Sequence, residues 1–484
     1  MANFELDEVE VRELRLGTIK AFYGTGEELT AKGSCGGLGD GKRCFSTSSY
    51  CSHITAMLDI SVISDVVVID HGPVGCSAGI INWNVNYQGI AKLAGFKARR
   101  IKVVSTNLLE ADTVYGAEEK LKRAIRTAKA RHNPGAIFVL STCVSSVIGE
   151  DIAAVVKELS VELNLPIGFV GCAGLRSKVW ATGFDASKHA IINALPIKKP
   201  QAKRNVVNYI DFFAQTTPTV VKYLAALDLK PLYLCCYSKV ADYATLAESV
   251  ATTGVCKTLS SYLGAYLEET FGVPYLKNNF GIGGTESFKS WFLDIAKVIG
   301  QEDKALAFYH QDLEDYEPTF RELKRRLKGV RAVVTLGPGF AFDIVSLLEE
   351  LGLEVIHANA HHFDPVIDGV KGDVTTRFDH PVSTSISDMQ HYETFKVLQK
   401  LKPDILVARV HAGQNYALPL GIPCVSLTGF ESFGLEGIAT TGNLILENLA
   451  NVNLVKKLAA KTTLGFSRSF LESNVESFVI KEAV

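Results

Sequence analysis

Short apolar runs alternate with longer stretches of helical spacing between Ser49 and about Pro196. Each run has the length and composition of a buried strand, and each longer stretch repeats its apolar residues as an amphipathic helix does. The expected strands are Val66–Ile69, Ile101–Ser105, Ala136–Leu140 and Pro166–Val170, and the expected helices are Gly116–Arg131 and Ile152–Leu163. Alternating strands and helices predict a parallel sheet with helices packed on it.

The same alternation returns twice further along the chain. The expected strands there are Val206–Ile210, Pro231–Cys235, Val330–Leu336, Glu354–Ile356, Ile405–Ala408 and Pro423–Leu427. One helix is expected over Thr216–Leu227, and another follows the Gly337–Phe340 turn and ends at Leu351. We therefore predict an α/β fold with three doubly wound parallel-sheet (Rossmann-like) domains around a central cofactor cleft. The predicted segments are an N-terminal arm over residues 1–48 and domains over residues 49–205, 206–327 and 328–484.

Composition and charge narrow the class of protein. The chain has 484 residues, of which 47% are hydrophobic and 21% charged, and its formal net charge is −2. This balance makes nucleic acid and anionic membranes unexpected partners. The first residues lack the basic-then-apolar order of a signal peptide, and no apolar run approaches the roughly 20 residues that span a bilayer. We expect a cytoplasmic protein whose ten cysteines serve metal binding, redox chemistry or packing rather than disulfides.

Three cysteines stand in unusual settings. Cys76 and Cys143 each follow an expected strand, so each thiol is predicted to lie where a strand ends. Glycines and a proline beside Cys76 suit a tight turn that brings the backbone close to a ligand. Together with Cys51, these residues offer the thiolates that an iron–sulfur cluster requires. The alternative is that each is a buried packing residue, as single cysteines often are.

The motifs around these cysteines carry a resemblance to a known family. The turn His71-Gly-Pro-Val-Gly-Cys76, the upstream Cys51, and Thr142-Cys-Val-Ser-Ser-Val-Ile-Gly-Glu-Asp-Ile152 resemble the bridging-cluster segments of the nitrogenase component 1 superfamily. The resemblance implies that Cys51, Cys76 and Cys143 bind an interface iron–sulfur cluster, similar to the eight-iron P-cluster, against a partner subunit.

A second segment resembles one particular branch of that superfamily. Cys256 stands in Thr253-Gly-Val-Cys-Lys-Thr-Leu, and the similarity continues through Gly272-Val-Pro274 and the Asn279–Ser287 stretch. The matching segment of the nitrogenase α subunit supplies the thiolate that anchors its catalytic cofactor. The resemblance therefore implies an α-type subunit in which Cys256 anchors a large iron–sulfur cofactor. Judged alone, Cys256 is a buried packing thiol, and Cys235 with Cys236 has no matching role.

Departures from the nitrogenase pattern bear on the substrate. Thr428 stands where nitrogenase has a cofactor-binding histidine, Trp180 and Phe184 replace hydrogen-bonding side chains at the substrate face, and Ala341 lies near the place of an expected arginine. These changes predict an apolar pocket that suits a carbon- or sulfur-containing substrate. We do not expect nitrogen fixation.

Histidines are candidates for a second cofactor anchor and for proton transfer. His411 lies between an expected strand and the Gly421-Ile-Pro turn, and His361 belongs to a group with His357 and His362 that follows another strand. Imidazole binds iron and transfers protons near neutral pH. Our preferred catalytic residues are His411, His361, Trp180 and Phe184, with His411 as the second anchor. Each histidine can instead be a hydrogen-bonded structural residue.

The resemblance implies a β-type partner subunit, in a heterodimer or an α2β2 heterotetramer, and an ATP-hydrolysing iron protein as electron donor. Neither a phosphate-binding loop nor a dinucleotide fingerprint occurs, and the Gly337–Phe340 turn lacks the required glycine spacing. Among relatives, methylthio-alkane reductase fits best, which implies reductive C–S cleavage of a small thioether. The alternatives are a cofactor-assembly scaffold and, less favoured, a reductase with a single four-iron cluster. The roles of Cys35 and Cys44 stay open.

Overall fold

The computed structural model describes residues 4–6, 8–33, 51–211, 216–235, 237–277, 280–368, 382–387, 391–409, 416–427 and 432–462. The chain forms two compact units. Unit 1 comprises residues 1–15, 50–278 and 294–301, and unit 2 comprises residues 16–49, 279–293 and 302–484.

A four-stranded parallel sheet in the order β3-β2-β4-β5 forms the first part of unit 1. Its strands are β2 (Val66–His71), β3 (Val103–Ser105), β4 (Ala136–Ser141) and β5 (Ile167–Val170). The helices and turns around it are α1 (Arg12–Arg15), α3 (Ser52–Ser61), α4 (Val74–Ser77), α5 (Ile80–Leu93), α6 (Glu110–Tyr115), α7 (Glu118–His132), α8 (Cys143–Val147), α9 (Ile152–Glu162), η1 (Gly174–Arg176) and α10 (Thr182–Ala194).

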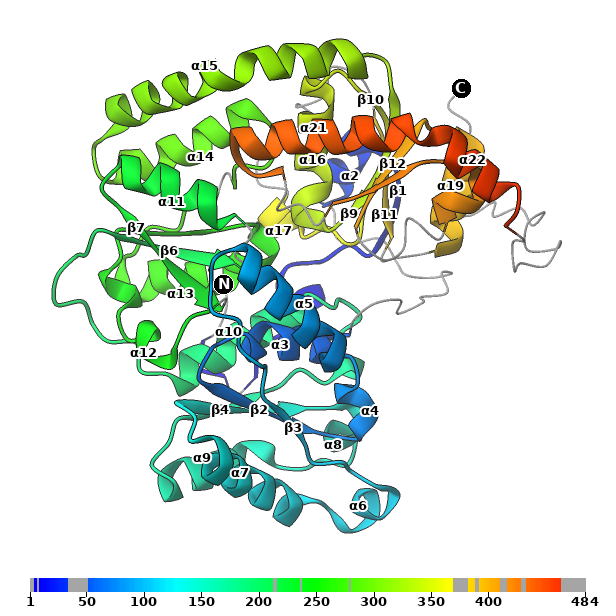
Figure 1. Cartoon of the computed structure of the whole chain (residues 1–484). Coiled ribbons are helices and arrows are strands. Elements are labelled where there is room, and N and C mark those ends of the chain that lie inside the picture. Colours follow the sequence, from blue (N-terminus) through cyan, green and yellow to red (C-terminus); the bar gives the residue numbers. More distant parts are fainter. Residues whose placement is uncertain are drawn as a thin grey trace. The chain divides into compact units, whose positions relative to one another are not determined.

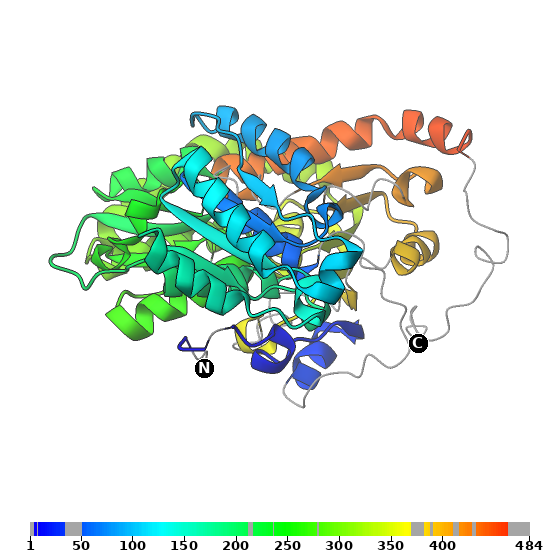
Figure 2. The same cartoon turned by 90° about the horizontal axis from the view of Figure 1, so that it is seen from below.

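Helices cover both faces of this sheet (Figures 1 and 2). Successive strand residues point to opposite faces, and Val67 and Val139 on one face pack with Leu121 of α7 and Leu159 of α9. Helices α3 and α10 lie on the other face (Figure 1). This arrangement explains why the strands read as continuous apolar runs in the sequence.

A three-stranded parallel sheet in the order β7-β6-β8 completes unit 1. Its elements are β6 (Val206–Asp211), α11 (Thr217–Ala226), β7 (Lys230–Cys235), α12 (Val240–Tyr243), η2 (Leu246–Glu248), β8 (Ala251–Gly254) and α13 (Lys257–Phe271). Helix α13 ends at Gly272, whose φ of +66° suits the left-handed C-terminal position that glycine favours.

Unit 2 is built on a six-stranded sheet in the order β1-β11-β10-β9-β12-β13. Five strands are parallel, and β1 pairs antiparallel with β11 at the edge. The elements are β1 (Ala21–Thr25), α2 (Gly26–Gly33), α15 (Glu302–Leu327), β9 (Arg331–Leu336), α16 (Pro338–Glu350), β10 (Glu354–Ala360), α17 (Pro365–Asp368), β11 (Ser383–Ser387), α19 (His391–Leu401), β12 (Ile405–Ala408), η3 (Leu418–Leu420), β13 (Cys424–Ser426), α21 (Gly434–Ala450) and α22 (Val452–Ala459). Helix α14 (Thr285–Val298) has residues in both units.

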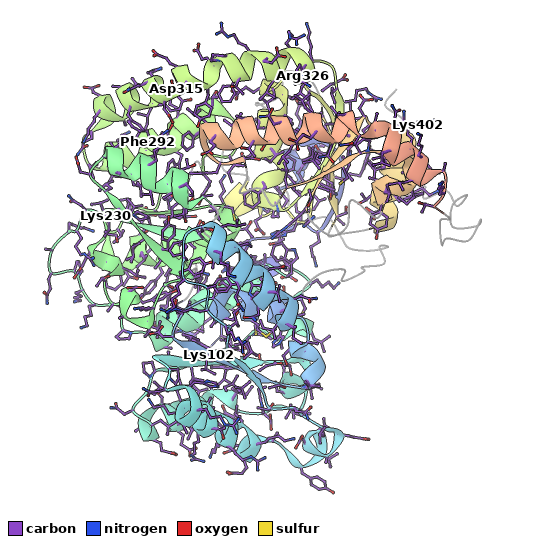
Figure 3. All side chains as sticks on the ribbon, in the orientation of Figure 1. Lys102, Lys230, Phe292, Asp315, Arg326 and Lys402 are labelled. Carbon is purple, nitrogen blue, oxygen red and sulfur yellow. The ribbon has the colours of Figure 1, made fainter. Side chains whose placement is uncertain are left out.

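Helix α15 has one side in the core of unit 2 and one side exposed to solvent. Asp315 and Arg326 lie on its exposed side (Figure 3), whereas Leu323 packs so close to α21 that a Cβ atom at Gly442 would lie 2.7 Å from it. No helix within the described parts of the chain is long and apolar enough to cross a membrane.

The predicted α/β class with parallel sheets is confirmed. The expected strands match β2 to β7, β9, β10, β12 and β13 within a few residues, but we did not anticipate β1, which adds an antiparallel strand from the segment predicted as an arm. The predicted domain boundaries after residues 48, 205 and 327 stay predictions.

Candidate functional site

Cys76 and Cys143 lie just after the carboxyl ends of β2 and β4, which are neighbours in the four-stranded sheet. The Thr142 hydroxyl donates a hydrogen bond to the His71 carbonyl at 3.0 Å, which ties the two strand ends together. A Cβ atom at Gly72 would lie 2.2 Å from the Thr142 methyl carbon, so the turn before Cys76 requires glycine. The sequence prediction that both thiols follow strands is confirmed.

Cys51 is the N-cap residue of α3, and Gly174 of η1 brings it together with Cys143. A Cβ atom added at Gly174 would lie 3.3 Å from the Cys51 Sγ and 3.4 Å from the Cys143 Sγ. Both sulfur atoms therefore converge on this glycine, whose missing side chain leaves room in front of them.

The protonation of Cys76 depends on its neighbours. Burial raises the pKa of Cys76 to about 11, and the Coulombic effect of Asp70, followed by those of Cys143 and Cys51, acts in the same direction. At neutral pH Cys76 is therefore a neutral thiol in the chain alone, and bound cationic iron would favour its thiolate.

Thiol groups of this kind fit an iron–sulfur cluster. Across the described ranges, no group of three His, Cys, Asp or Glu side chains is placed to hold one metal ion. A cluster needs a different arrangement, because its thiolates are distributed over several irons. Cys51, Cys76 and Cys143 are all partly buried, so a ligand or a partner can reach them.

Exposed apolar side chains lie beside the three thiols. Val74 precedes Cys76 by two residues, Val147 ends α8, and Leu175 follows Gly174; they are 62%, 73% and 75% exposed. Exposed apolar surface around a polar site is typical of a protein–protein interface.

The sequence analysis did not identify the polar groups near these thiols. The His53 Nε2 atom lies 3.2 Å from an oxygen of the fully buried Asp70, but neither Asp70 oxygen accepts a well-directed hydrogen bond from the described residues. The His53 Nδ1 atom lies 3.7 Å from the sulfur of Cys172. An aspartate at the end of an otherwise apolar strand was the signal that could have drawn attention to Asp70.

Cys256 lies in a different environment, directly after β8, where it caps the N-terminus of α13 and is 6% exposed. Its carbonyl accepts a hydrogen bond from the Ser260 hydroxyl at 2.7 Å, and that hydroxyl lies 2.9 Å from the Tyr275 hydroxyl. A Cβ atom at Gly254 would lie 2.6 Å from the Ile210 carbonyl, so glycine lets β8 end close to β6. A helix N-terminus stabilises negative charge, which suits a thiolate ligand.

Trp180 and Phe184 lie together at the start of α10. Their rings meet edge to face at 5.7 Å with an interplanar angle of 73°. Phe184 is buried and Trp180 is partly buried, so the pair presents apolar surface.

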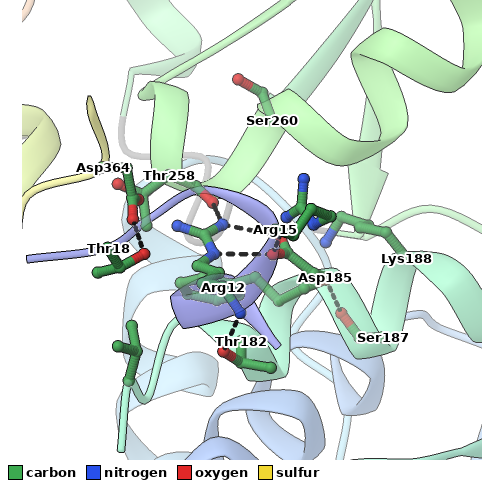
Figure 4. A network of polar contacts seen from close by, with 12 residues as sticks. Arg12, Arg15, Thr18, Thr182, Asp185, Ser187, Lys188, Thr258, Ser260 and Asp364 are labelled. Atoms are coloured by element: carbon green, nitrogen blue, oxygen red, sulfur yellow. Dashed lines mark hydrogen bonds and ion pairs between the residues drawn. The ribbon is translucent and has the colours of Figure 1, made fainter. Parts of the chain in front are cut away.

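Arg12 joins the helices that carry these groups (Figure 4). Its guanidinium makes two hydrogen bonds to Asp185 of α10, at 2.7 and 2.8 Å, and donates to the Thr258 carbonyl of α13 at 2.6 Å. Arg15 also pairs with Asp185. Arg12 has no exposure and Asp185 is 1% exposed. The segment predicted as an arm therefore supplies a buried link between α10 and α13, and no sequence motif announced it.

Two histidines of unit 2, His357 and His361, are buried. Burial lowers the pKa of His361, which follows β10, to about 3, and the cation of Arg409 acts in the same direction. His357 contacts the hydroxyls of Ser383 and Ser385 at 3.0 and 2.9 Å, and burial lowers its pKa to about 4. At neutral pH both imidazoles are uncharged, so each has one donor and one acceptor nitrogen.

The Arg409 side chain lies near the turn at Gly337, where the family pattern has an arginine that this sequence lacks. A Cβ atom at Gly337 would lie 3.7 Å from the Arg409 guanidinium, while Ala341 of α16 is fully buried. The candidates His411, Thr428, Cys35 and Cys44 lie outside the described residues, so the role proposed for His411 stays a prediction.

Known proteins share the sequence and fold of this chain. A family model described as nitrogenase component 1 type oxidoreductase matches residues 51–450. The nitrogenase iron-molybdenum cofactor biosynthesis protein NifE of Clostridium pasteurianum is 27% identical over 439 residues, 87% of this chain and 92% of the relative. A nitrogenase molybdenum-iron protein alpha chain of Methanothermobacter thermautotrophicus is 26% identical over 399 residues, 78% of this chain and 82% of the relative. A solved structure titled "Nitrogenase Cp1 at pH 5" has a TM-score of 0.71 at 19% identity, covering 86% of this chain and 91% of that one, which shows a common fold.

Proposed function

The chain belongs to the nitrogenase component 1 type oxidoreductases, and on that premise we propose that it is the α-type catalytic subunit of a nitrogenase-like iron–sulfur reductase. The observation that supports this most directly is the convergence of the Cys51 and Cys143 sulfurs on Gly174. Cys76 lies at the neighbouring strand end, so the three thiols provide the donors for a P-cluster-like interface cluster.

A β-type subunit would complete this interface cluster. The thiols are partly buried in the single chain, and exposed Val74, Val147 and Leu175 lie beside them. A partner that covers this apolar surface would also exclude water from the cluster. An ATP-hydrolysing iron protein is the proposed electron donor.

Cys256 is the proposed anchor of a large iron–sulfur cofactor. When bound, that cofactor would supply the electrons and the metal sites for reduction of the substrate. Trp180 and Phe184 would exclude water from the substrate, and the neutral His361 would hold a hydrogen bond or a proton near it. His411 is the proposed second anchor.

The substrate proposed is a methylthio-alkane, cleaved reductively at a C–S bond. The paired rings of Trp180 and Phe184 favour an apolar molecule over one that needs hydrogen-bonding groups. Under this proposal, ethyl methyl sulfide or a similar thioether would be reduced to a thiol and an alkane.

Metal analysis with electron paramagnetic resonance tests the two-site proposal. The chain would be purified without oxygen alongside its partner, as the parent and as Cys256→Ala. We expect the parent to hold iron for two clusters and the variant to lose one class of signal. Cys424→Ala is the control, because Cys424 is partly buried and belongs to β13, away from the Cys256 segment in the sequence. A variant with the full iron content and spectrum of the parent would remove the anchoring role of Cys256.

A cofactor-assembly scaffold is the second candidate. It is favoured by the similarity to NifE over 92% of that protein and by Thr428 at the place of a cofactor-binding histidine. A scaffold would transfer its bound cluster to a cofactor-free acceptor and would not turn over thioethers. Turnover without transfer supports the reductase, and transfer without turnover supports the scaffold.

A further inference from the structure

A basic surface lies between the end of α5 and the start of β3 in unit 1. From His71 to Leu109 the chain has no Asp or Glu. The five lysines and arginines of that segment all fall within residues 92–102, namely Lys92, Lys97, Arg99, Arg100 and Lys102. The whole chain has a formal net charge of −2, so its overall composition conceals this local excess of positive charge.

These five cations are accessible to a ligand. Four of them are exposed and Lys102 is partly exposed. Within the described parts of the chain, none of the five side chains makes an ion pair or a hydrogen bond. Lys122 of α7, by contrast, pairs with both Glu118 and Glu158. Because like charges repel, a cluster of cations without a counter-ion favours an anionic partner.

Packing holds the loop that carries these cations in a defined shape. The Phe96 ring stacks on the Tyr237 ring with 4.3 Å between their centres. The Ile101 backbone N–H donates a hydrogen bond to the Asn84 side chain of α5 at 2.9 Å. The fold therefore keeps the cations together at the surface.

The basic surface lies away from the thiols of the proposed interface cluster. Strand β3 runs parallel to β2, and Lys102 directly precedes β3. The Lys102 carbonyl accepts a hydrogen bond from the Val68 N–H of β2 at 3.0 Å, whereas Cys76 follows the carboxyl end of β2. The cations and the thiols therefore lie toward opposite ends of these strands.

An exposed apolar side chain lies among the cations. Leu93 follows Lys92 at the end of α5 and is 88% exposed. Trp83 and Tyr87 form the buried side of the same helix. A helix end that combines an exposed apolar side chain with a cluster of cations is typical of segments that rest on an anionic lipid surface.

We propose that residues 92–102 form a docking surface for an anionic phospholipid membrane. The five cations would neutralise lipid phosphates, and Leu93 would enter the headgroup region. A protein interface would favour aromatic side chains over lysine, and a nucleic acid would favour exposed rings that stack on its bases. The proposal does not depend on the reductase function, because it needs neither a cofactor nor a partner subunit.

Cosedimentation of the full chain with lipid vesicles tests this proposal. The vesicles would contain phosphatidylglycerol and phosphatidylcholine in equal amounts, or phosphatidylcholine alone. We expect the chain to bind the anionic vesicles at least about tenfold more tightly than the neutral ones, and to be released as the salt concentration rises. Equal binding to both kinds of vesicle, or no binding to the anionic ones at low salt, would overturn the proposal.

Charge-reversal variants locate the binding surface. Lys97→Glu combined with Arg99→Glu and Arg100→Glu should weaken binding to the anionic vesicles at least about tenfold. The matched control combines Lys324→Glu, Arg326→Glu and Lys328→Glu at the end of α15, which changes the net charge equally and also replaces exposed cations. The control should keep most of the binding of the parent. Equal weakening by the two triple variants would show that only the net charge matters, against the proposal.

Two further measurements separate a membrane from other anionic partners. Leu93→Asp should also weaken vesicle binding at least about tenfold, because a carboxylate does not enter the headgroup region readily, and unchanged binding would contradict docking through this surface. Binding of the parent to polyglutamate-coated beads, without binding to the anionic vesicles, would assign the surface to an acidic protein instead. The vesicle measurement on the parent decides the matter even if a variant does not fold.

Discussion

The thiols at the two sheet edges of unit 1 lie in opposite environments. Cys51, Cys76 and Cys143, around the edge of the four-stranded sheet, are partly buried and have exposed apolar neighbours. Cys235 and Cys256, at the edge of the three-stranded sheet, are buried among internal charges and hydrogen bonds. We interpret the first edge as a site that a partner completes and the second as one that the chain completes alone.

The largest expected effect comes from breaking the charge network of the second edge. Arg12→Gln leaves the buried carboxylate of Asp185 with Arg15 as its remaining cation. Removing one member of a buried ion pair costs about 3 to 5 kcal/mol of unfolding free energy, measured by chemical denaturation. Arg126→Gln is the matched control, because Arg126 makes the same two-bonded contact to Glu162 at the surface, and its loss should cost far less because solvent screens an exposed pair. Equal losses of unfolding free energy in the two variants would show that water reaches the contacts of Arg12.

A buried histidine of unit 2 allows the effect of burial to be measured through the pH dependence of the unfolding free energy. Burial lowers the pKa of His357 from 6.5 to about 4, so the unfolded chain binds the proton more tightly than the folded chain. Its contribution to stability is complete above pH 6.5 and is lost as the pH falls toward 4, by up to about 3 kcal/mol.

Denaturation at several pH values checks this sign. His357→Asn should flatten the fall in unfolding free energy between pH 6.5 and 4 relative to the parent. His132→Asn is the control, since His132 lies exposed at the end of α7 and should leave the slope unchanged. His361 contributes in the same direction in every protein compared, so the difference from the parent isolates His357. An unchanged slope in His357→Asn would contradict the prediction.

The local sequence pattern predicted the strands and the position of the thiols at strand ends, because both depend on neighbouring residues in the sequence. The run Val66–Ile69 ends in the turn that carries Cys76, and this order alone places the thiol at a strand end. Arg12 could not be predicted, because its partner Asp185 is 173 residues away. The importance of Gly174 depends likewise on two distant sulfurs. Lys188 reads as one charged residue on an amphipathic helix, because its buried partner Asp59 is distant in the sequence.

Gly174→Val tests the first edge with a smaller expected effect on stability. Its side chain would meet the Cys51 and Cys143 sulfurs, which can turn aside in the empty chain but not when both bind a cluster. We expect the interface cluster to be lost, with its iron and its resonance signal, while the unfolding free energy of the cluster-free chain falls by only about 1 kcal/mol. Gly79→Val is the control, because Gly79 has an αR conformation and no atom near its missing Cβ. Full iron content in Gly174→Val would exclude a shared cluster at this glycine.

The smallest expected effect on stability comes from charges placed on the exposed apolar surface. Val147→Asp combined with Leu175→Asp should weaken association with the proposed β-type partner at least about tenfold, because desolvating a carboxylate in an interface opposes binding. The unfolding free energy of the chain should change by no more than about 0.5 kcal/mol, since both side chains are largely exposed. Val161→Asp on α9, which is 81% exposed and lies outside the turns that carry the thiols, is the control for sedimentation of the mixed subunits. If the double variant binds the partner as tightly as the parent and Val161→Asp do, the partner does not cover this edge, and the partial exposure of the three thiols needs another explanation.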